Sequence, residues 1–123
     1  MNYEYTTTYL AEENMNIELS TEEYEHICDT IIEPTLDKLR KGGQKEYAQD
    51  VKNVFANFQR VADDIDVSID KAIWVYMRKH VDGIKSHIKG YKSQREPIEG
   101  RIGDLITYLK LLWAYEIKNE KVK

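Results

Sequence analysis

The stretch that decides the fold lies in the middle of the chain, where residues 47–65 read YAQDVKNVFANFQRVADDI. At about 100° per residue, its apolar side chains fall within one arc of roughly 100° around a helix axis. These side chains are Tyr47, Val51, Val54, Phe55, Phe58, Val61, Ala62 and Ile65. Such an arc is typical of a helix that buries one face, so the stretch predicts an amphipathic helix.

Three further segments show the same helical periodicity. The first begins at the capping box Ser20-Thr21-Glu22-Glu23, and Pro34 inside it predicts a kink or a split. The next begins near Ser68 and stops at Gly90, and the last begins at Pro97, a residue favoured in a first helical turn. Four amphipathic segments joined by short links predict an all-α fold, an antiparallel bundle of about four helices.

The apolar stripes of these segments give the expected core. In the first segment the stripe is Tyr24, Ile27, Cys28, Ile31, Ile32 and Leu39. In the segment that begins near Ser68 it is Ile73, Tyr76, Met77, His80, Ile84, His87 and Ile88. In the last segment it is Ile98, Ile102, Leu105, Ile106, Leu109, Leu112 and Trp113. Further apolar groups lie off the stripes, namely Trp74, Val75, Leu111 and Tyr115. These groups indicate a second buried face, so we expect a homo-oligomer.

The beginning of the chain has a different composition. Tyr3, Tyr5 and the threonines between Tyr5 and Tyr9 are aromatic or β-branched, and such residues favour extended backbone. A second short run, residues 15–19, alternates apolar and polar side chains. We therefore expect an extended N-terminal arm over residues 1–19, with a β-hairpin as one form of it, and a helical bundle domain over residues 20–123.

Composition excludes several classes of protein. The chain of 123 residues is 41% hydrophobic and 33% charged, which fits one folded domain. A net charge of −4 gives no strong nucleic-acid signal, and the apolar runs are too short for a membrane span. The first residues lack the basic start and apolar block of a secretory signal. Cys28, the single cysteine, is typical of a reducing compartment, so we expect a cytoplasmic protein.

The common catalytic signatures are missing from the sequence. It contains no glycine-rich phosphate loop, no His-Glu-x-x-His helix and no nucleophile elbow. Cys28 falls on an apolar stripe, which favours a buried, inert thiol. His80 and His87 share one face of their helix, but no third ligand has a suitable spacing, so the pattern favours core histidines over a metal site. We expect no catalytic residue and no cofactor.

A polar margin beside the apolar stripes carries the clearest chemical pattern. Its basic groups can meet phosphates, its tyrosines can stack on a base, and its amide can read the edge of a base. The predicted ligand-binding residues are Asn57, Arg60, Lys79, Tyr91, Lys92, Arg95, Arg101, Asp104 and Tyr108. The alternative is a set of ordinary surface ion pairs and interface tyrosines.

Two stretches resemble a known family. Lys45-Glu46-Tyr47-Ala48, followed by Phe55 and Phe58, resembles the Lys-x-x-Asp-Tyr-Gly…Phe stretch of an all-helical phage family, the nucleotide-modification-associated domain. Residues 96–108, EPIEGRIGDLITY, are similar to the closing helix of that family, which is itself similar to MazG-like nucleotide pyrophosphohydrolases. Lys79 matches the lysine of its Asp-Lys-x-x-Arg-Leu motif. The resemblance covers roughly residues 44–113.

The departures from the family pattern concern its metal ligands. The closing helix of the family carries two acids four residues apart, whereas this chain has Gly100 at the first position and Asp104 at the second. Arg78 and Asp82 stand where the family has an aspartate and an arginine around the lysine. Loss of half a chelating pair together with a gain of basic groups favours binding of an anion over its hydrolysis.

Three functions are consistent with these patterns. The first is a small, oligomeric, phage-encoded protein in the host cytoplasm that binds or sequesters a nucleotide or a nucleotide-derived signal, in an anti-defence role. The second is a MazG-like pyrophosphohydrolase that requires magnesium, with Glu96, Glu99 and Asp104 as the metal ligands. The third is a viral inhibitor of a protein–protein interaction that uses the tyrosine-rich arm.

Overall fold

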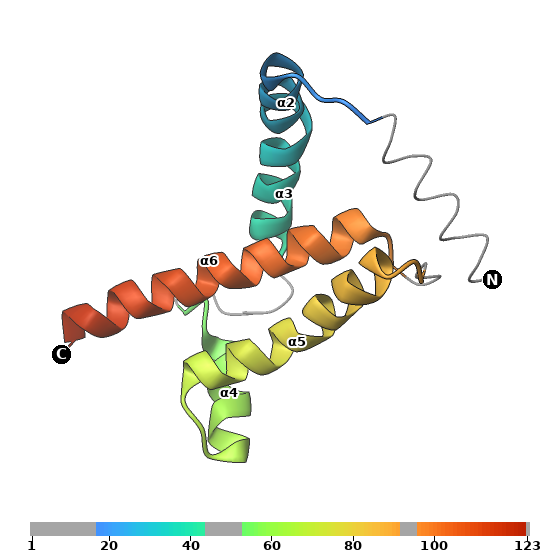
Figure 1. Ribbon diagram of the computed structural model, residues 1–123. Helices are drawn as coiled ribbons and strands as arrows, with labels where there is room; N and C mark the ends of the chain where they lie inside the picture. The colour runs from blue at the N-terminus through green and yellow to red at the C-terminus, as the bar shows by residue number, and fades with distance from the viewer. Residues whose placement is uncertain (1–16, 44–52, 92–95, 123) are drawn as a thin grey trace.

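The computed structural model describes residues 17–43, 53–91 and 96–122, and Figure 1 shows their arrangement. The elements in these ranges are helix α2 (Thr21–Ile27), a π-helical turn η1 (Cys28–Ile32), and helices α3 (Glu33–Gly43), α4 (Ala56–Ile65), α5 (Ile69–Ile88) and α6 (Ile98–Val122). The predicted all-α class is therefore confirmed. Among the described helices, none has the length and the apolar content that crossing a bilayer requires.

The expected N-terminal arm falls mostly on residues that the structure does not describe. Residues 1–16, which hold its tyrosines and the predicted turn, lie outside the described ranges. Residues 17–19 are described, and they are exposed and neither helical nor extended into a strand. The hairpin form of the arm stays a prediction.

Helices α5 and α6 run antiparallel and form the largest helix pair of the structure (Figure 1). Helix α4 packs against α5, and α3 packs against α6. The segments α2, η1 and α3 form one continuous rod that rises away from the α5–α6 pair (Figure 1). Of the described segments of this rod, α3 is the one that contacts the α5–α6 pair.

The core lies where α4, α5 and α6 meet. Its buried side chains are Phe58, Ala62, Ala72, Ile73, Met77 and Tyr108. The ring of Phe58 makes edge contacts with Tyr76 and Tyr108, with ring centroids 5.4 Å and 6.1 Å away. Aromatic pairs in this geometry add about 0.5–1.5 kcal/mol beyond the burial of their area.

The predicted capping box opens α2. The side chain of Ser20 accepts a hydrogen bond from the Glu23 amide at 3.1 Å, and its hydroxyl donates to the Glu23 carboxylate at 3.1 Å. The expected disturbance at Pro34 takes the form of the π-helical turn that immediately precedes α3. There the Glu33 amide donates a hydrogen bond to the carbonyl of Cys28, five residues back. Such a wider turn accommodates Pro34, because proline has no amide hydrogen to donate.

The other predicted helix boundaries around α5 are confirmed. Ser68 is the N-cap of α5, although its hydroxyl donates to the Asp70 carboxylate. Gly90 follows the C-terminus with φ 103°, a left-handed conformation that glycine adopts without a steric penalty.

Helix α4 begins later than the sequence pattern predicts. The described part of the 47–65 stretch is a turn at residues 53–55, and the helix starts at Ala56. The Asn53 side chain accepts a hydrogen bond from the Phe55 amide at 3.0 Å, and its carbonyl accepts from the Ala56 amide at 3.2 Å. A short amide side chain that bonds the nearby backbone offers the chain an alternative to the helix, and here that alternative prevails.

The predicted stripe of the first segment is wrong for most of its length. No residue of α2 or η1 is buried; Ile27 and Cys28 are half-buried, whereas Tyr24, Ile31 and Ile32 are exposed. Among the residues that the structure describes, the rod meets the other helices through its last turns, where Leu36 is buried and Leu39 reaches Gly103 on α6. The predicted apolar face of α2 and η1 therefore packs against no helix outside the rod in the part of the chain that the structure describes.

The predicted face of α6 is wrong in part. Leu105 and Leu112 pack against the core as expected, but other members of the stripe do not. Ile102, Leu109 and Trp113, which were expected in the core, are exposed, and Tyr108, which was expected on a polar flank, is buried. Leu111 and Tyr115 pack toward the core as well; the Tyr115 ring lies 5.8 Å from that of Phe55. Helix α6 is apolar on two sides, and the side that carries Tyr108 is the one that meets α4 and α5.

Burial on α5 leads to a direct test of the core. Ile73 is fully buried and Ile88, on the same helix, is 72% exposed. We expect Ile73→Val to lower the free energy of unfolding by about 0.5–1.5 kcal/mol, because it removes a buried methyl group and leaves a small cavity. The matched change Ile88→Val is expected to stay within about 0.5 kcal/mol of the unmodified chain. Urea unfolding followed by circular dichroism measures both, and equal effects would contradict the described core.

Candidate functional site

One face of α6 carries the polar residues that meet α5. Arg101, Asp104 and Tyr108 are three or four residues apart, so they lie on the same side of the helix. His80 projects from α5 toward this face, is only 2% exposed, and lies against the Tyr108 ring with centroids 5.6 Å apart. We call His80, Glu96, Arg101 and Asp104 the His80 cluster.

The distances within the His80 cluster are short. His80 Nε2 lies 4.0 Å from Asp104 Oδ2, and Arg101 Nη1 lies 3.7 Å from Glu96 Oε2. Arg101 also donates to the main-chain carbonyl of Lys79 at 3.5 Å. His80, Glu96 and Asp104 each offer one potential ligand atom, and these atoms all lie within 4.8 Å of one another.

The environment of the cluster shifts two pKa values. Burial lowers the pKa of His80 from its ordinary value, and the nearby Asp104 carboxylate opposes this effect. Burial raises the pKa of Asp104, and the His80 ring opposes that change while Glu96 adds to it. The lowered pKa favours the neutral imidazole, which has a lone pair on one ring nitrogen.

Gly83 makes room for Arg101. A Cβ atom at this position of α5 would overlap the Arg101 side chain, including its guanidinium group. The absent side chain therefore lets Arg101 lie across α5 and reach both Glu96 and the Lys79 carbonyl. The cluster depends on this close approach of two helices.

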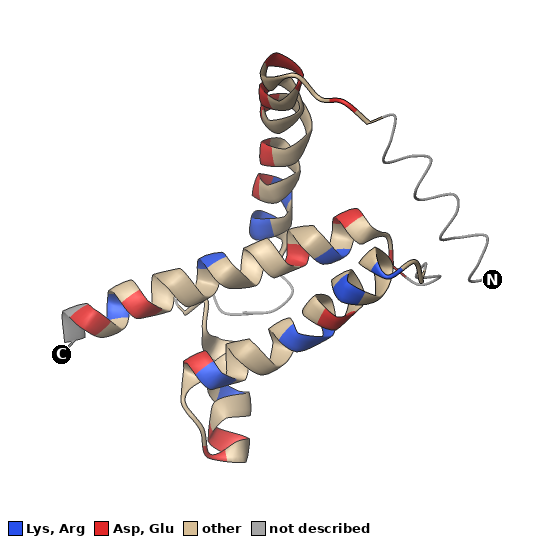
Figure 2. Cartoon of the chain, viewed as in Figure 1, with Lys and Arg blue, Asp and Glu red and all other residues tan. Residues whose placement is uncertain are grey.

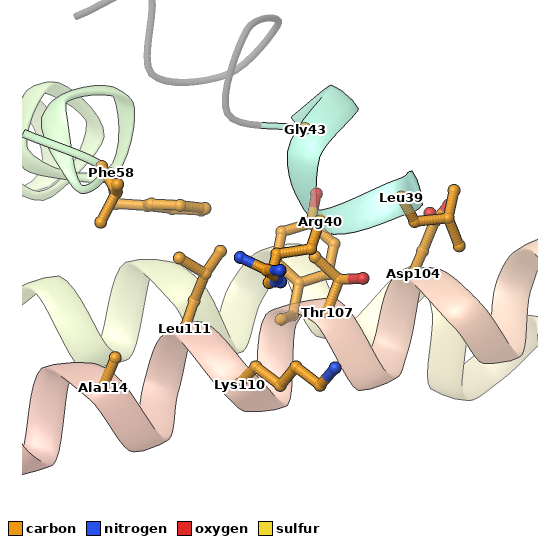
Figure 3. A pocket seen from close by; sticks show the side chains of 11 residues that line it. Leu39, Arg40, Gly43, Phe58, Asp104, Thr107, Lys110, Leu111 and Ala114 are labelled. Carbon is orange, nitrogen blue, oxygen red and sulfur yellow. The ribbon is translucent and has the colours of Figure 1, made fainter. Parts of the chain in front are cut away.

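Asp104 and Tyr108 of this α6 face also line a cavity of about 190 Å³. We call this cavity the α3–α6 cavity, and apolar groups from α3, α4 and α6 form most of its lining. The lining includes Leu39, Arg40, Phe58, Asp104, Tyr108 and Lys110. Figure 3 shows the Arg40 side chain extending from α3 toward α6, with Lys110 on the opposite wall and the Phe58 ring to one side. Asp104 and Tyr108 thus border both the cavity and the His80 cluster.

The structure brings together part of the predicted ligand site. Arg101 and Asp104 lie within the His80 cluster, the Lys79 carbonyl joins them, and the Tyr108 ring adjoins His80. Basic and acidic residues alternate along the second half of α5 and the first half of α6 in Figure 2. Arg101 itself forms an ion pair with Glu96 of its own chain.

The other predicted residues lie apart from the cluster. Arg60 donates to the Asn57 side chain at 3.0 Å, and neither residue makes a hydrogen bond or an ion pair with a described residue of α5 or α6. Tyr91 is exposed just after α5. Lys92 and Arg95 lie outside the described residues.

Sequence reasoning missed several members of both sites. His80 was expected to be a core histidine without a third metal ligand, yet Asp104 lies near it on α6, and Glu96 lies near it in the residues just before α6. Glu99, the remaining ligand of the magnesium alternative, is exposed in the first turn of α6 and is not part of this group. Arg40 and Lys110 carried no distinguishing motif, because only the packing of α3 on α6 places them around one cavity.

The close approach at Gly83 can be tested by substitution. An alanine in place of a helical glycine usually raises the free energy of unfolding by about 0.5–1 kcal/mol. We expect this gain for Gly42→Ala on α3, where a Cβ meets nothing within 4 Å, but no gain or a loss for Gly83→Ala, because Arg101 must move. In an Arg101→Ala background, Gly83→Ala is expected to regain the ordinary stabilisation. Equal gains for Gly83→Ala and Gly42→Ala in urea unfolding would contradict the described contact.

Comparison with known proteins adds no assignment to this geometry. None of the protein-family models, curated proteins or solved structures that were compared with the chain matches it.

Proposed function

We propose that the protein binds a nucleotide or a nucleotide-derived small molecule in the α3–α6 cavity. The observation that carries this proposal is the combination of aromatic walls with two cationic side chains around one cavity. Phe58 and Tyr108 line it from α4 and α6, and Arg40 and Lys110 line it from α3 and α6. An apolar cavity with a few convergent polar groups is the usual form of a small-molecule site.

The size of the cavity suits a flat ring. A cavity of about 150 Å³ lined by apolar side chains accepts a benzene molecule, and the cavity here measures about 190 Å³. A heteroaromatic base is of this size, whereas a complete nucleotide is larger. The phosphate groups would therefore lie at the mouth of the cavity, where the cationic side chains are exposed.

The two cations are available to an anion. Arg40 lies 3.8 Å from Asp37, and both side chains are largely exposed, with 44% and 60% of their surface open. An exposed pair of this kind contributes about 0–1 kcal/mol, so a phosphate can replace Asp37 at little cost. Lys110 is exposed and makes no ion pair with any residue in the described part of the chain. A guanidinium group binds phosphate in a bidentate manner, which also sets the orientation of the ligand.

Asp104 supplies a different kind of contact. Its carboxylate lies in the wall of the cavity, half-buried, opposite the apolar groups of α3. A carboxylate accepts hydrogen bonds from the exocyclic amino groups that several bases carry. This contact would favour amino-bearing bases over others.

The remaining parts of the sequence-based hypotheses are predictions without further support. The anti-defence role and the phage origin rest on the resemblance over residues 44–113 alone. For the magnesium-dependent pyrophosphohydrolase, Glu96 and Asp104 do lie together, but Glu99 does not join them. The tyrosine-rich arm of the third hypothesis lies mainly outside the described residues.

Calorimetric titration of the full chain with adenine and guanine mononucleotides, cyclic nucleotides and inorganic phosphate tests the cavity. We expect binding of at least one nucleotide and no comparable binding of phosphate alone, because the base supplies the buried contact. Arg40→Ala combined with Lys110→Ala is expected to weaken binding about 10²- to 10⁴-fold, since two lost charged hydrogen bonds at about 1.5–3 kcal/mol each sum to about 3–6 kcal/mol. Arg60→Ala with Lys118→Ala, which removes the same charges away from the cavity, is the matched control.

Leu111→Trp, which fills the cavity, is expected to abolish binding; nucleotide binding that survives it would refute this site.

We also infer that the protein forms a homo-oligomer through the outer side of α6. Ile102, Leu109, Trp113 and Ile117 follow one another at spacings of seven, four and four residues, so they share one side of the helix. Their exposed fractions are 43%, 45%, 72% and 50%.

The area of this stripe is of the size that a stable dimer needs. Since a fully exposed Trp offers about 250 Å², the four side chains together present on the order of 400 Å² of apolar surface. One partner of a standard interface buries about 800 Å², of which slightly more than half is apolar. A second copy of the chain is the occupant that presents the same stripe in return.

Sedimentation equilibrium tests the oligomer. We expect the unmodified chain to have a mass that is a multiple of 14.5 kDa, and Trp113→Glu to shift it to 14.5 kDa, because the carboxylate would be buried at the interface. Lys118→Glu, at an exposed position of the same helix outside the stripe, is expected to leave the mass unchanged. An unmodified chain that sediments at 14.5 kDa over the whole concentration range would overturn the inference.

A further inference from the structure

We propose that His80, Glu96 and Asp104 form a binding site for one divalent transition-metal ion, with Zn²⁺ as the ion that fits best. This inference does not rest on nucleotide binding, because it concerns the cluster between α5 and α6 and not the α3–α6 cavity. Asp104 is the only ligand that borders both.

The spacing of the ligand atoms is close to that of a metal site. One atom from each of the three residues lies within 4.8 Å of the others, and His80 Nε2 is 4.0 Å from Asp104 Oδ2. Bonds of about 2.0–2.2 Å to a shared ion place ligand atoms about 3–4 Å from one another. The Glu96 and Asp104 side chains are 34% and 30% exposed, so neither carboxylate is fully enclosed by packing.

His80 is a buried polar side chain that hydrogen bonds leave unsatisfied. Its side chain is 3% exposed, and within the described residues neither ring nitrogen makes a hydrogen bond. The Nε2 atom faces Asp104 at a distance too long for a hydrogen bond, and the Tyr108 ring holds the imidazole from one side. A metal ion between His80 and the carboxylates would give Nε2 a partner, in an orientation that the packing has already set, and would leave Nδ1 as the protonated nitrogen.

The charges of the cluster favour a divalent cation. Metal binding displaces protons from its ligands, and once deprotonated Glu96 and Asp104 bring two negative charges to the half-buried imidazole. Arg101 lies beside Glu96 Oε2, and since a carboxylate has two oxygens, Glu96 can contact Arg101 and a metal ion at once. Arg101, which Gly83 admits, then holds this ligand in position.

The donor set identifies the class of the ion. Imidazole nitrogen suits zinc and its neighbours in the first transition row, whereas Mg²⁺ prefers oxygen ligands and retains several waters. One nitrogen and two carboxylate oxygens therefore favour Zn²⁺ over Mg²⁺. Three protein ligands also leave one position of a tetrahedral ion open to water or to another molecule.

Calorimetric titration of the full chain with ZnCl₂, after chelator treatment and dialysis, tests the site. We expect one ion per chain, with affinity at least tenfold lower in Asp104→Asn and in Glu96→Gln. The matched changes Asp64→Asn, at an exposed aspartate of α4, and His26→Gln, at an exposed histidine of α2, are expected to leave the affinity unchanged. Mg²⁺ is expected to bind much more weakly than Zn²⁺.

The histidine signals of the unmodified chain give a second measurement that requires no variant of a buried residue. The sequence contains His26, His80 and His87 only, so imidazole NMR signals can be assigned individually. Zn²⁺ is expected to shift the His80 signals alone, and Mn²⁺ is expected to broaden them first. Absence of Zn²⁺ binding, full affinity in Asp104→Asn, a shift confined to His26 or His87, or equal affinity for Mg²⁺ would each overturn the proposal.

Discussion

The contact of the Tyr108 ring with α4 and α5 is the interaction on which the rest of the structure depends. This single side chain of α6 meets Phe58 of α4 at 6.1 Å, Tyr76 of α5 at 6.3 Å and His80 of α5 at 5.6 Å between ring centroids. Because a rigid ring that touches two other helices sets the rotation of its own helix, Tyr108 determines which side of α6 faces inward. Every other contact of α6 follows from that rotation.

Both candidate sites are consequences of this rotation. Asp104 precedes Tyr108 by four residues and so faces the same way, which brings a carboxylate into the interior between α5 and α3. Arg101 lies one turn earlier and enters the space that Gly83 leaves on α5. The face of α6 that carries Arg101, Asp104 and Tyr108 therefore lies between the His80 cluster and the α3–α6 cavity.

The same rotation leaves apolar surface without a partner in the described part of the chain. The outer side of α6 carries Trp113 at 72% exposure, and the rod formed by α2, η1 and α3 exposes Tyr24, Ile31 and Ile32 along its length. A chain with so few buried side chains in its first segment gains little stability from that segment by itself. Association between copies would bury this surface and supply the missing contacts.

The sequence by itself determined the all-α class, the capping box at Ser20, the disturbance before α3 and the ends of α5, because these depend on local backbone chemistry that few neighbouring residues control. It also indicated Arg101, Asp104 and Tyr108 as residues of one helix face. Only the tertiary structure decided which of the two apolar sides of α6 is buried, since helical periodicity describes a stripe without describing its partner. For the same reason, the meeting of His80 with Glu96 and Asp104, and of Arg40 with Lys110, depended on how separate helices pack, which no spacing along the chain records.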